Sequence, residues 1–74
     1  MKVTVRVQGH LRRYRPEGFE LELPDAATVR MLIDASGIPW EEVLLVAVNG
    51  KRALEADPLH DGDQVMLLAP MEGG

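Results

Sequence analysis

Apolar and polar residues alternate strictly in two stretches of the first third of the chain. Valine occupies every second position within residues 2–8, and phenylalanine or leucine does so within residues 19–23. A period of two is typical of a strand with one face buried. The loop between them, residues 9–18, has glycine at each end and a proline inside. The pattern therefore predicts two strands that form an antiparallel hairpin.

A helical period replaces the alternation in the next stretch. Apolar residues recur at helical spacing from Val29, and the hydroxyl of Thr28 can cap free backbone N–H groups. Gly37 suits the left-handed position after a helix, and Pro39 prevents its continuation. We predict one helix over residues 28–36. At about nine residues it would be marginal alone, so packing on a sheet must stabilise it.

The second half of the chain predicts three more strands. Residues 43–48 are apolar, with β-branched side chains at three of six positions, which favours a strand central in the sheet. Asn49-Gly50 is a strong hairpin signal, and residues 51–54 would return from it. Residues 64–69 form the last strand. The order β, β, α, β, β, β predicts an α+β fold: a β-grasp, in which one helix packs across a mixed sheet of four or five strands and the last strand lies parallel to the first.

Length, charge and cysteine content narrow the function classes. The chain has 74 residues, no cysteine and a net charge of −4. We expect one domain over residues 1–70 and a tail over residues 71–74. The acidic balance argues against nucleic acid as a partner. No disulfide or thiolate metal site can form, and no apolar stretch approaches membrane-spanning length, so we expect a cytoplasmic protein without membrane contact.

Chemistry concentrates at the end of the sequence, which closes with Gly73-Gly74. Without Cβ atoms, two glycines can pass through a narrow channel into a buried site of another protein. An α-carboxyl has an ordinary pKa of about 3.3–3.7, so it is ionised near neutrality and can act as a nucleophile. To carry a group it must first be activated, for example as an acyl-adenylate. The chain has no phosphate-binding loop, so we expect a partner to use ATP and Mg²⁺, with no cofactor bound here.

Several stretches, in this order and spacing, resemble the MoaD/ThiS sulfur carriers, which are prokaryotic relatives of ubiquitin. The stretches are Leu11-Arg12, residues 27–32, residues 48–50, residues 58–65 and the terminal Gly73-Gly74. The resemblance covers the whole chain and is closest to MoaD, the small subunit of molybdopterin synthase. It implies a ubiquitin-like β-grasp.

The resemblance also implies a function. An adenylating enzyme related to the ubiquitin-activating enzymes would activate the carboxylate of Gly74, and a sulfur donor would convert it to a thiocarboxylate. The carrier would then deliver sulfur to the large subunit of molybdopterin synthase, in molybdenum or tungsten cofactor biosynthesis. Thiamine thiazole formation and tRNA thiolation are alternative pathways, and a β-grasp binding module with an inert tail is an alternative function. We expect no stand-alone catalysis, since the chain shows no nucleophile–base pair.

One face of the sheet is a candidate partner-binding surface. If the alternate side chains of the last strand point to the core, the others point outward and meet outward side chains of the strand over residues 43–48. Exposed apolar patches of this kind often mark interfaces. The candidate partner-binding residues are Leu45, Ala47, Met66 and Leu68 on this face, with Pro70, Met71 and Glu72 ahead of the reactive glycines Gly73 and Gly74.

Charged and titratable residues in the predicted loops give weaker signals. Arg12, Arg13 and Arg15 form a basic cluster in an acidic protein, which is either a solvated loop or a docking element for an acidic partner. His10 and His60 have no identifiable partners at catalytic or metal-binding spacing. We therefore expect both to be surface histidines.

Overall fold

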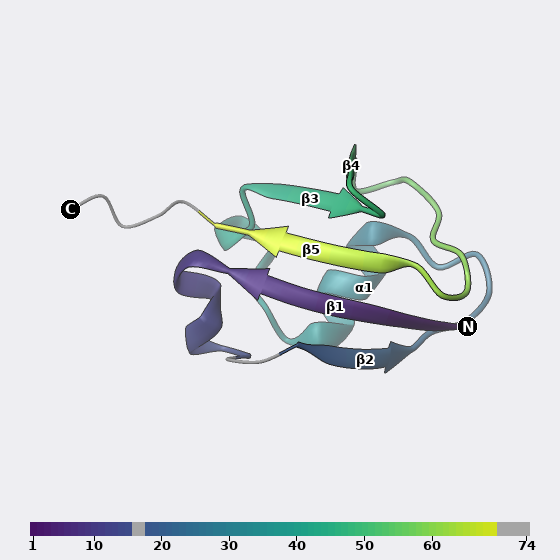
Figure 1. Cartoon of the computed structure of the whole chain (residues 1–74), viewed down its shortest axis with the longest axis horizontal. Helices are drawn as coiled ribbons and strands as arrows, with labels where there is room; N and C mark the ends of the chain where they lie inside the picture. The colour runs from purple at the N-terminus through teal and green to yellow at the C-terminus, as the bar shows by residue number, and fades with distance from the viewer. Residues whose placement is uncertain (16–17, 70–74) are drawn as a thin grey trace.

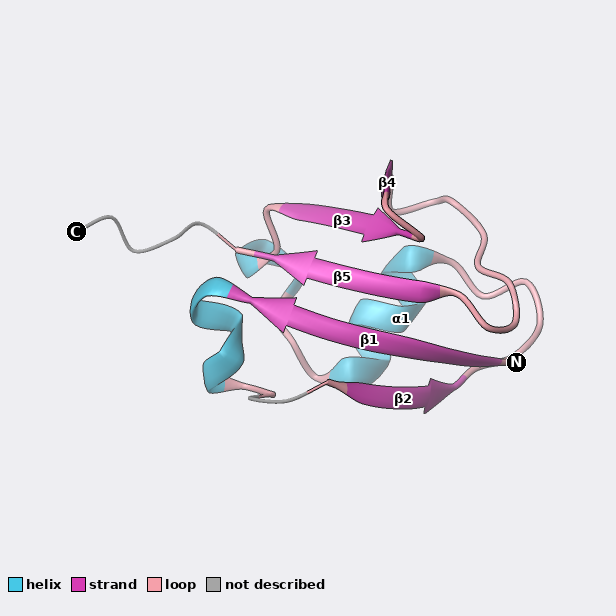
Figure 2. Cartoon of the chain, viewed as in Figure 1, coloured by secondary structure: helices cyan, strands magenta, loops and turns pink. Residues whose placement is uncertain are grey.

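The computed structural model describes residues 1–15 and 18–69 and has one helix packed on a five-stranded sheet (Figure 1). Short 3-10 helices, η1 and η2, lie in two of the connections (Figure 2). The elements in chain order are β1 (Lys2–Gln8), η1 (Gly9–Arg13), β2 (Phe19–Glu22), α1 (Val29–Ser36), η2 (Trp40–Glu42), β3 (Leu45–Val48), β4 (Lys51–Ala53) and β5 (Gln64–Leu68).

The sheet has the strand order β2-β1-β5-β3-β4. Strand β1 pairs with β2 in the antiparallel sense and with β5 in the parallel sense. Strand β3 is antiparallel to both β5 and β4. The parallel β1–β5 pair at the centre and the helix across one face confirm the predicted ubiquitin-like β-grasp.

Local sequence signals set the ends of α1. The Oγ1 atom of Thr28 accepts a hydrogen bond of 3.3 Å from the backbone N–H of Met31, which satisfies one of the free donors of the first turn. Gly37 adopts the left-handed conformation at φ 81°. The helix therefore begins and ends where the sequence predicts. Within the described residues, no helix is long and apolar enough to cross a membrane.

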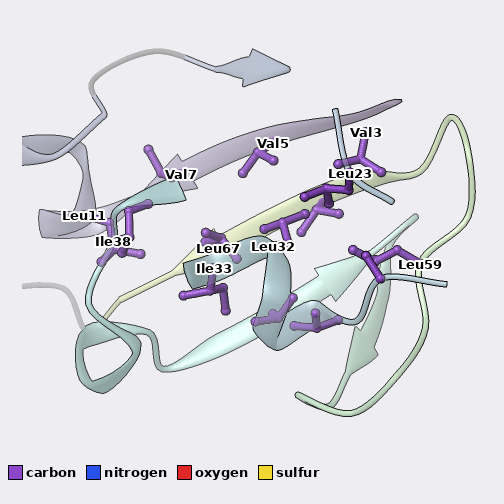
Figure 3. Packing of buried hydrophobic residues seen from close by; sticks show 14 of the residues in the cluster. Val3, Val5, Val7, Leu11, Leu23, Leu32, Ile33, Ile38, Leu59 and Leu67 are labelled. Carbon is purple, nitrogen blue, oxygen red and sulfur yellow. The ribbon is translucent and has the colours of Figure 1, made fainter. Parts of the chain in front are cut away.

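The core lies between α1 and one face of the sheet (Figure 3). The valines of β1 and alternate residues of β5 meet Leu32 and Ile33 of the helix, both fully buried. Leu11 of η1 is also fully buried at one end of this core, and Trp40 packs against the core while remaining half-exposed. The alternation in the sequence thus corresponds to the division between the helix-covered face and the helix-free face.

Several expectations need correction. Residues 9–13 form η1 rather than an irregular loop, because Leu11 is drawn into the core and Gly9 turns the chain at φ 72°. Strand β3 begins at Leu45 rather than at residue 43, because η2 extends to Glu42 and the N–H of Val43 still bonds to the carbonyl of Trp40 at 3.1 Å. Strand β3 is not the central strand that its sequence predicts, since the middle position belongs to β5. Strands β4 and β5 end at Ala53 and Leu68, one residue earlier than predicted.

Candidate docking face and tail exit

Strand β5 connects the two candidate functional regions. Its outward side chains lie on the helix-free face, which looks toward the viewer in Figure 1. It ends on the same side of the sheet as β1, since the two strands are parallel, and the sequence continues from there to Gly74. Ala69 is the last described residue. Residues 70–74, with the candidate residues Pro70, Met71, Glu72, Gly73 and Gly74, lie outside the described part of the chain.

The strand register brings the four candidate apolar residues of the helix-free face together. Met66 lies opposite Ala47, and Leu68 lies opposite Leu45. All four side chains are half-buried, whereas Val65 and Leu67 between them are buried in the core. We call Leu45, Ala47, Met66 and Leu68 the docking face. Their partner-binding role stays a prediction.

Two arginines flank the docking face. Met66 is paired with Arg6 of β1 on one side, and Ala47 is paired with Arg52 of β4 on the other. Both arginines are exposed, and neither forms an ion pair with another residue in ranges 1–15 and 18–69. The face is thus an apolar centre between two cations that have no ion-pair partner in the described part of the chain, in a protein whose net charge is −4.

The docking face is hollowed. A depression of about 410 Å³ is lined by Met66, Ala47 and Leu68 together with Arg6 and polar residues of the strand ends. A second depression of about 470 Å³, between η2 and the segment after β4, includes Leu45 at its rim with the exposed Leu44 and Leu54. The first depression has the mixed apolar and cationic lining that suits an apolar side chain close to a carboxylate.

Backbone contacts surround the end of β5. The N–H of Leu44 donates a hydrogen bond of 2.7 Å to the carbonyl of Leu68. On the other side, a Cβ placed on Gly9 would lie only 2.9 Å from the carbonyl oxygen of Ala69, so the backbones of η1 and β5 are in direct contact. The side chain of Ala69 is buried. The chain therefore leaves the sheet between η1 and the η2–β3 connection.

A single carboxylate ties η1 to η2 at this exit. One oxygen of Glu42 accepts a hydrogen bond from the hydroxyl of Tyr14, and the other lies 3.1 Å from Nε2 of His10. The hydrogen bond to Glu42, followed by desolvation and the nearby negative charge, raises the pKa of Tyr14 above its ordinary value of 10.0. We call Glu42, His10 and Tyr14 the clasp.

The sequence interpretation missed the clasp. His10 is not an isolated surface histidine, since its side chain is 20% exposed and faces Glu42. His60 is largely exposed, at 79% of its side chain, although its Nδ1 lies 3.9 Å from Asp63. Glu42 lies 28 residues from Tyr14 in the sequence, and no local periodicity connects two such positions.

The basic cluster divides into different environments. The guanidinium of Arg15 lies 3.8 Å from the ring centroid of Phe19 and donates to the carbonyl of Ser36 at 3.4 Å, so it stabilises the fold. Arg13 donates from Nε to the carbonyl of His10 at 3.2 Å, while Arg12 is exposed on η1. Only part of the cluster is therefore available for a partner.

The described residues provide no group of three or more histidine, cysteine, aspartate or glutamate side chains that could hold a metal ion. Asp63, the most buried acidic residue among those that the structure describes, takes part instead in the turn that precedes β5. It accepts hydrogen bonds from the side-chain amide of Asn49 at 2.9 Å and from the N–H of His60 at 2.8 Å. The Asp61-Gly62-Asp63 segment is thus a structural turn.

Comparison with known proteins gives a family match over nearly the whole chain. The ThiS family matches residues 5–74. The chain belongs to the ThiS family. This membership and the solved structures described below show a ThiS/MoaD-like sulfur carrier with a β-grasp fold.

Solved structures with the same fold cover the chain almost completely. SAMP1 from Haloferax volcanii has a TM-score of 0.82 and 19% identity, with 100% of both chains covered. Subunit 1 of a molybdopterin converting factor from Pyrococcus furiosus, named as putative, has a TM-score of 0.78 and 27% identity, covering 96% of this chain and 99% of that one. A chain in the complex of subunits 1 and 2 of the molybdopterin-converting factor from Helicobacter pylori has a TM-score of 0.68 and 29% identity over 100% of both. The first likeness concerns the fold alone.

A curated relative is a UPF0288 protein of Methanothermobacter thermautotrophicus. It is 41% identical over 49 residues, which make up 65% of this chain. The match spans only 9% of that protein's length. The relative is therefore a much longer protein that contains one matching segment.

Proposed function

We propose that this chain carries sulfur as a thiocarboxylate on Gly74 and donates it in molybdopterin synthesis, as the small subunit of a molybdopterin synthase-type complex. The observation that carries the proposal is the full-length similarity, at 29% identity, to a chain in the complex of subunits 1 and 2 of a molybdopterin-converting factor. The terminal Gly73-Gly74, a few residues beyond a central strand, supplies the reacting group.

The chemistry divides between the carrier and its partners. The carboxylate of Gly74 attacks the α-phosphate of ATP on an adenylating enzyme related to the ubiquitin-activating enzymes, which gives an acyl-adenylate and releases pyrophosphate. Mg²⁺ on that partner stabilises the phosphate charge. Hydrosulfide then displaces AMP from the acyl carbon and gives the thiocarboxylate. Its sulfur bonds to an acceptor carbon on the large subunit and displaces the leaving group there. Water hydrolyses the resulting thioester, which leaves the sulfur on the acceptor and returns the carboxylate.

The docking face supports this division of labour. A carrier without a catalytic group of its own must bind each partner tightly enough to place its terminus in the partner's active site. Met66 and Ala47 offer an apolar centre, and Arg6 and Arg52 offer charges for acidic residues of the partner. Methionine suits a surface that meets several partners, since its side chain adapts to different shapes.

A thiazole-forming pathway is the second candidate, because the family that matches the chain is named for ThiS. The two pathways share the loading step and differ in the sulfur acceptor. Loaded carrier mixed with a molybdopterin synthase large subunit or with thiazole synthase therefore distinguishes them, since only the cognate acceptor consumes the thiocarboxylate.

The loading step itself is tested by intact mass. With ATP, Mg²⁺, the cognate adenylating enzyme and a sulfide donor, the mass should rise by the difference between one sulfur atom and one oxygen atom. A variant lacking Gly74 should show no rise and should melt at the same temperature as the unmodified chain. Acquisition of sulfur by the deletion variant would refute the carrier mechanism and favour a binding module with an inert tail.

A further inference from the structure

We propose that Gly9 and the clasp are positioning elements of sulfur loading, which fix the direction in which the chain leaves β5 at Ala69. This inference rests on the proposed function, because a defined exit matters only if the terminus must reach a partner's active site. It adds residues on η1 and η2, and Tyr14 at the end of η1, none of which belongs to the docking face.

The first observation is the contact between Gly9 and Ala69. Gly9 follows β1 as the first residue of η1 and has φ 72°. A Cβ at this position would come within 2.9 Å of the carbonyl oxygen of Ala69 and 3.5 Å of its carbonyl carbon. Both are backbone atoms of the last described residue, so they cannot turn aside as a flexible side chain would. Any side chain at Gly9 must therefore displace the backbone at the exit.

The second observation is that η1 is itself held in place. Leu11 anchors η1 in the core with no exposed surface, and the clasp joins it to η2 through both oxygens of Glu42. The segment after η2 bonds back to β5, through the 2.7 Å hydrogen bond from Leu44 to Leu68. A closed chain of contacts thus runs from η1 through Glu42 to β5, and back to η1 through Ala69.

A fixed exit has a kinetic consequence. Two docking-face residues, Met66 and Leu68, lie on β5, and Ala69 directly follows this strand. Docking of the face therefore determines where the terminus starts its path into the partner. Reactions between held groups are sensitive to placement, and a displacement of about 1 Å can cost about a hundredfold in rate. Changing the exit should therefore slow loading without weakening docking.

Gly62 provides a matched control for Gly9. It has a positive φ of 84°, but a Cβ added there meets no atom within 4 Å. Gly9→Ala and Gly62→Ala therefore share the backbone strain of a left-handed alanine, and only Gly9→Ala also displaces Ala69. Their comparison separates the contact from the general cost of the substitution.

The experiment measures steady-state thiocarboxylate formation by mass spectrometry, with the cognate adenylating enzyme, ATP, Mg²⁺ and sodium sulfide. We expect Gly9→Ala to lower kcat by about tenfold or more relative to Gly62→Ala, with KM for the carrier little changed. Tyr14→Phe removes only the hydroxyl of a partly exposed side chain. It should lower kcat in the same direction by a smaller factor, without changing KM.

Two outcomes would overturn the inference. Equal kcat values for Gly9→Ala and Gly62→Ala show that the contact with Ala69 does not position the terminus. If Gly9→Ala does not fold, Tyr14→Phe decides, and a kcat equal to that of the unmodified chain refutes the inference. Failure of the proposed function looks different, because the unmodified chain itself then acquires no sulfur.

Discussion

Met66→Asp tests whether the helix-free face binds the adenylating enzyme. Met66 lies at the centre of the docking face, opposite Ala47 and beside Arg6. Its side chain is half-buried on the side of the sheet away from α1, so the substitution should leave the core intact. The matched control is Met31→Asp, which makes the same change at a methionine that is 44% exposed on α1, on the other side of the sheet.

The expected loss of binding free energy follows from the surface of the Met66 side chain that is still exposed in the free protein. Full burial of a methionine side chain is worth about 1.5–3 kcal/mol, and the larger part of Met66 is already covered, so the part that remains contributes at most about 1 kcal/mol to the contact. Met66→Ala should therefore weaken binding by up to about fivefold. Aspartate also requires desolvation of a carboxylate, which costs several kcal/mol and which Arg6 offsets in part. We expect a net loss of about 3 kcal/mol, roughly a hundredfold in Kd.

Titration calorimetry against the adenylating enzyme measures this loss, and thermal melting of the free variants measures the fold. The docking hypothesis requires Met66→Asp to melt near the unmodified chain and to bind far more weakly than Met31→Asp. Equal affinities for the two variants would show that the enzyme does not contact this face. A large drop in melting temperature for Met66→Asp alone would show that the side chain supports the core.

Three further predictions concern the clasp, the core and the helix cap. Tyr14 is the only tyrosine, so its ultraviolet absorbance should report a pKa above 10.0, and this pKa should fall toward 10.0 in Glu42→Gln. The folded state holds the proton of Tyr14 more tightly than the unfolded state does. The resulting stabilisation is therefore present below pH 10 and is lost as the pH rises through the raised pKa. Leu32→Ala, at a fully buried position, should lower the unfolding free energy measured in urea by about 2–5 kcal/mol. An unchanged urea unfolding curve would contradict this prediction. Thr28→Ala removes the cap and should cost about 1 kcal/mol, a drop of about 4–8 °C in melting temperature.

Elements with a periodic signal were predictable from the sequence. The alternation within residues 2–8 gave β1 with its bounds, because one face of that strand meets a helix and the other meets solvent. The cap at Thr28 and the glycine at position 37 gave both ends of α1. The outward positions of Met66 and Leu68 followed from the same alternation, since successive side chains of a strand point to opposite faces.

Features that depend on single long-range contacts were not predictable. Leu11 is the one apolar side chain that draws η1 into the core, and one residue in a loop has no period to reveal it. The clasp joins side chains that are 28 or more residues apart in the sequence. The close approach of Gly9 to Ala69 requires the parallel pairing of β1 and β5 before it can be inferred. Such contacts follow from the tertiary fold, and local sequence patterns carry little information about them.

Strand register links the stability of this protein to its proposed function. The same five residues of β5 supply Val65 and Leu67 to the core and Met66 and Leu68 to the docking face. A slip by one residue would exchange these sets, burying one and exposing the other. The start of β5 is held against such a slip by the side chain of Asn49, whose oxygen accepts from the N–H of Gln64 at 2.9 Å.

The turn network before β5 therefore acts on a surface that it does not touch. Asp63, which is 8% exposed, accepts a hydrogen bond from the side-chain amide of Asn49. This bond connects the hairpin turn between β3 and β4 to the residue before β5. This fixes which side chains of β5 face a partner. Because Ala69 directly follows β5, it also fixes where the chain leaves the sheet at the opposite end. A carrier whose reacting group lies beyond its last strand depends on that strand for both docking and direction.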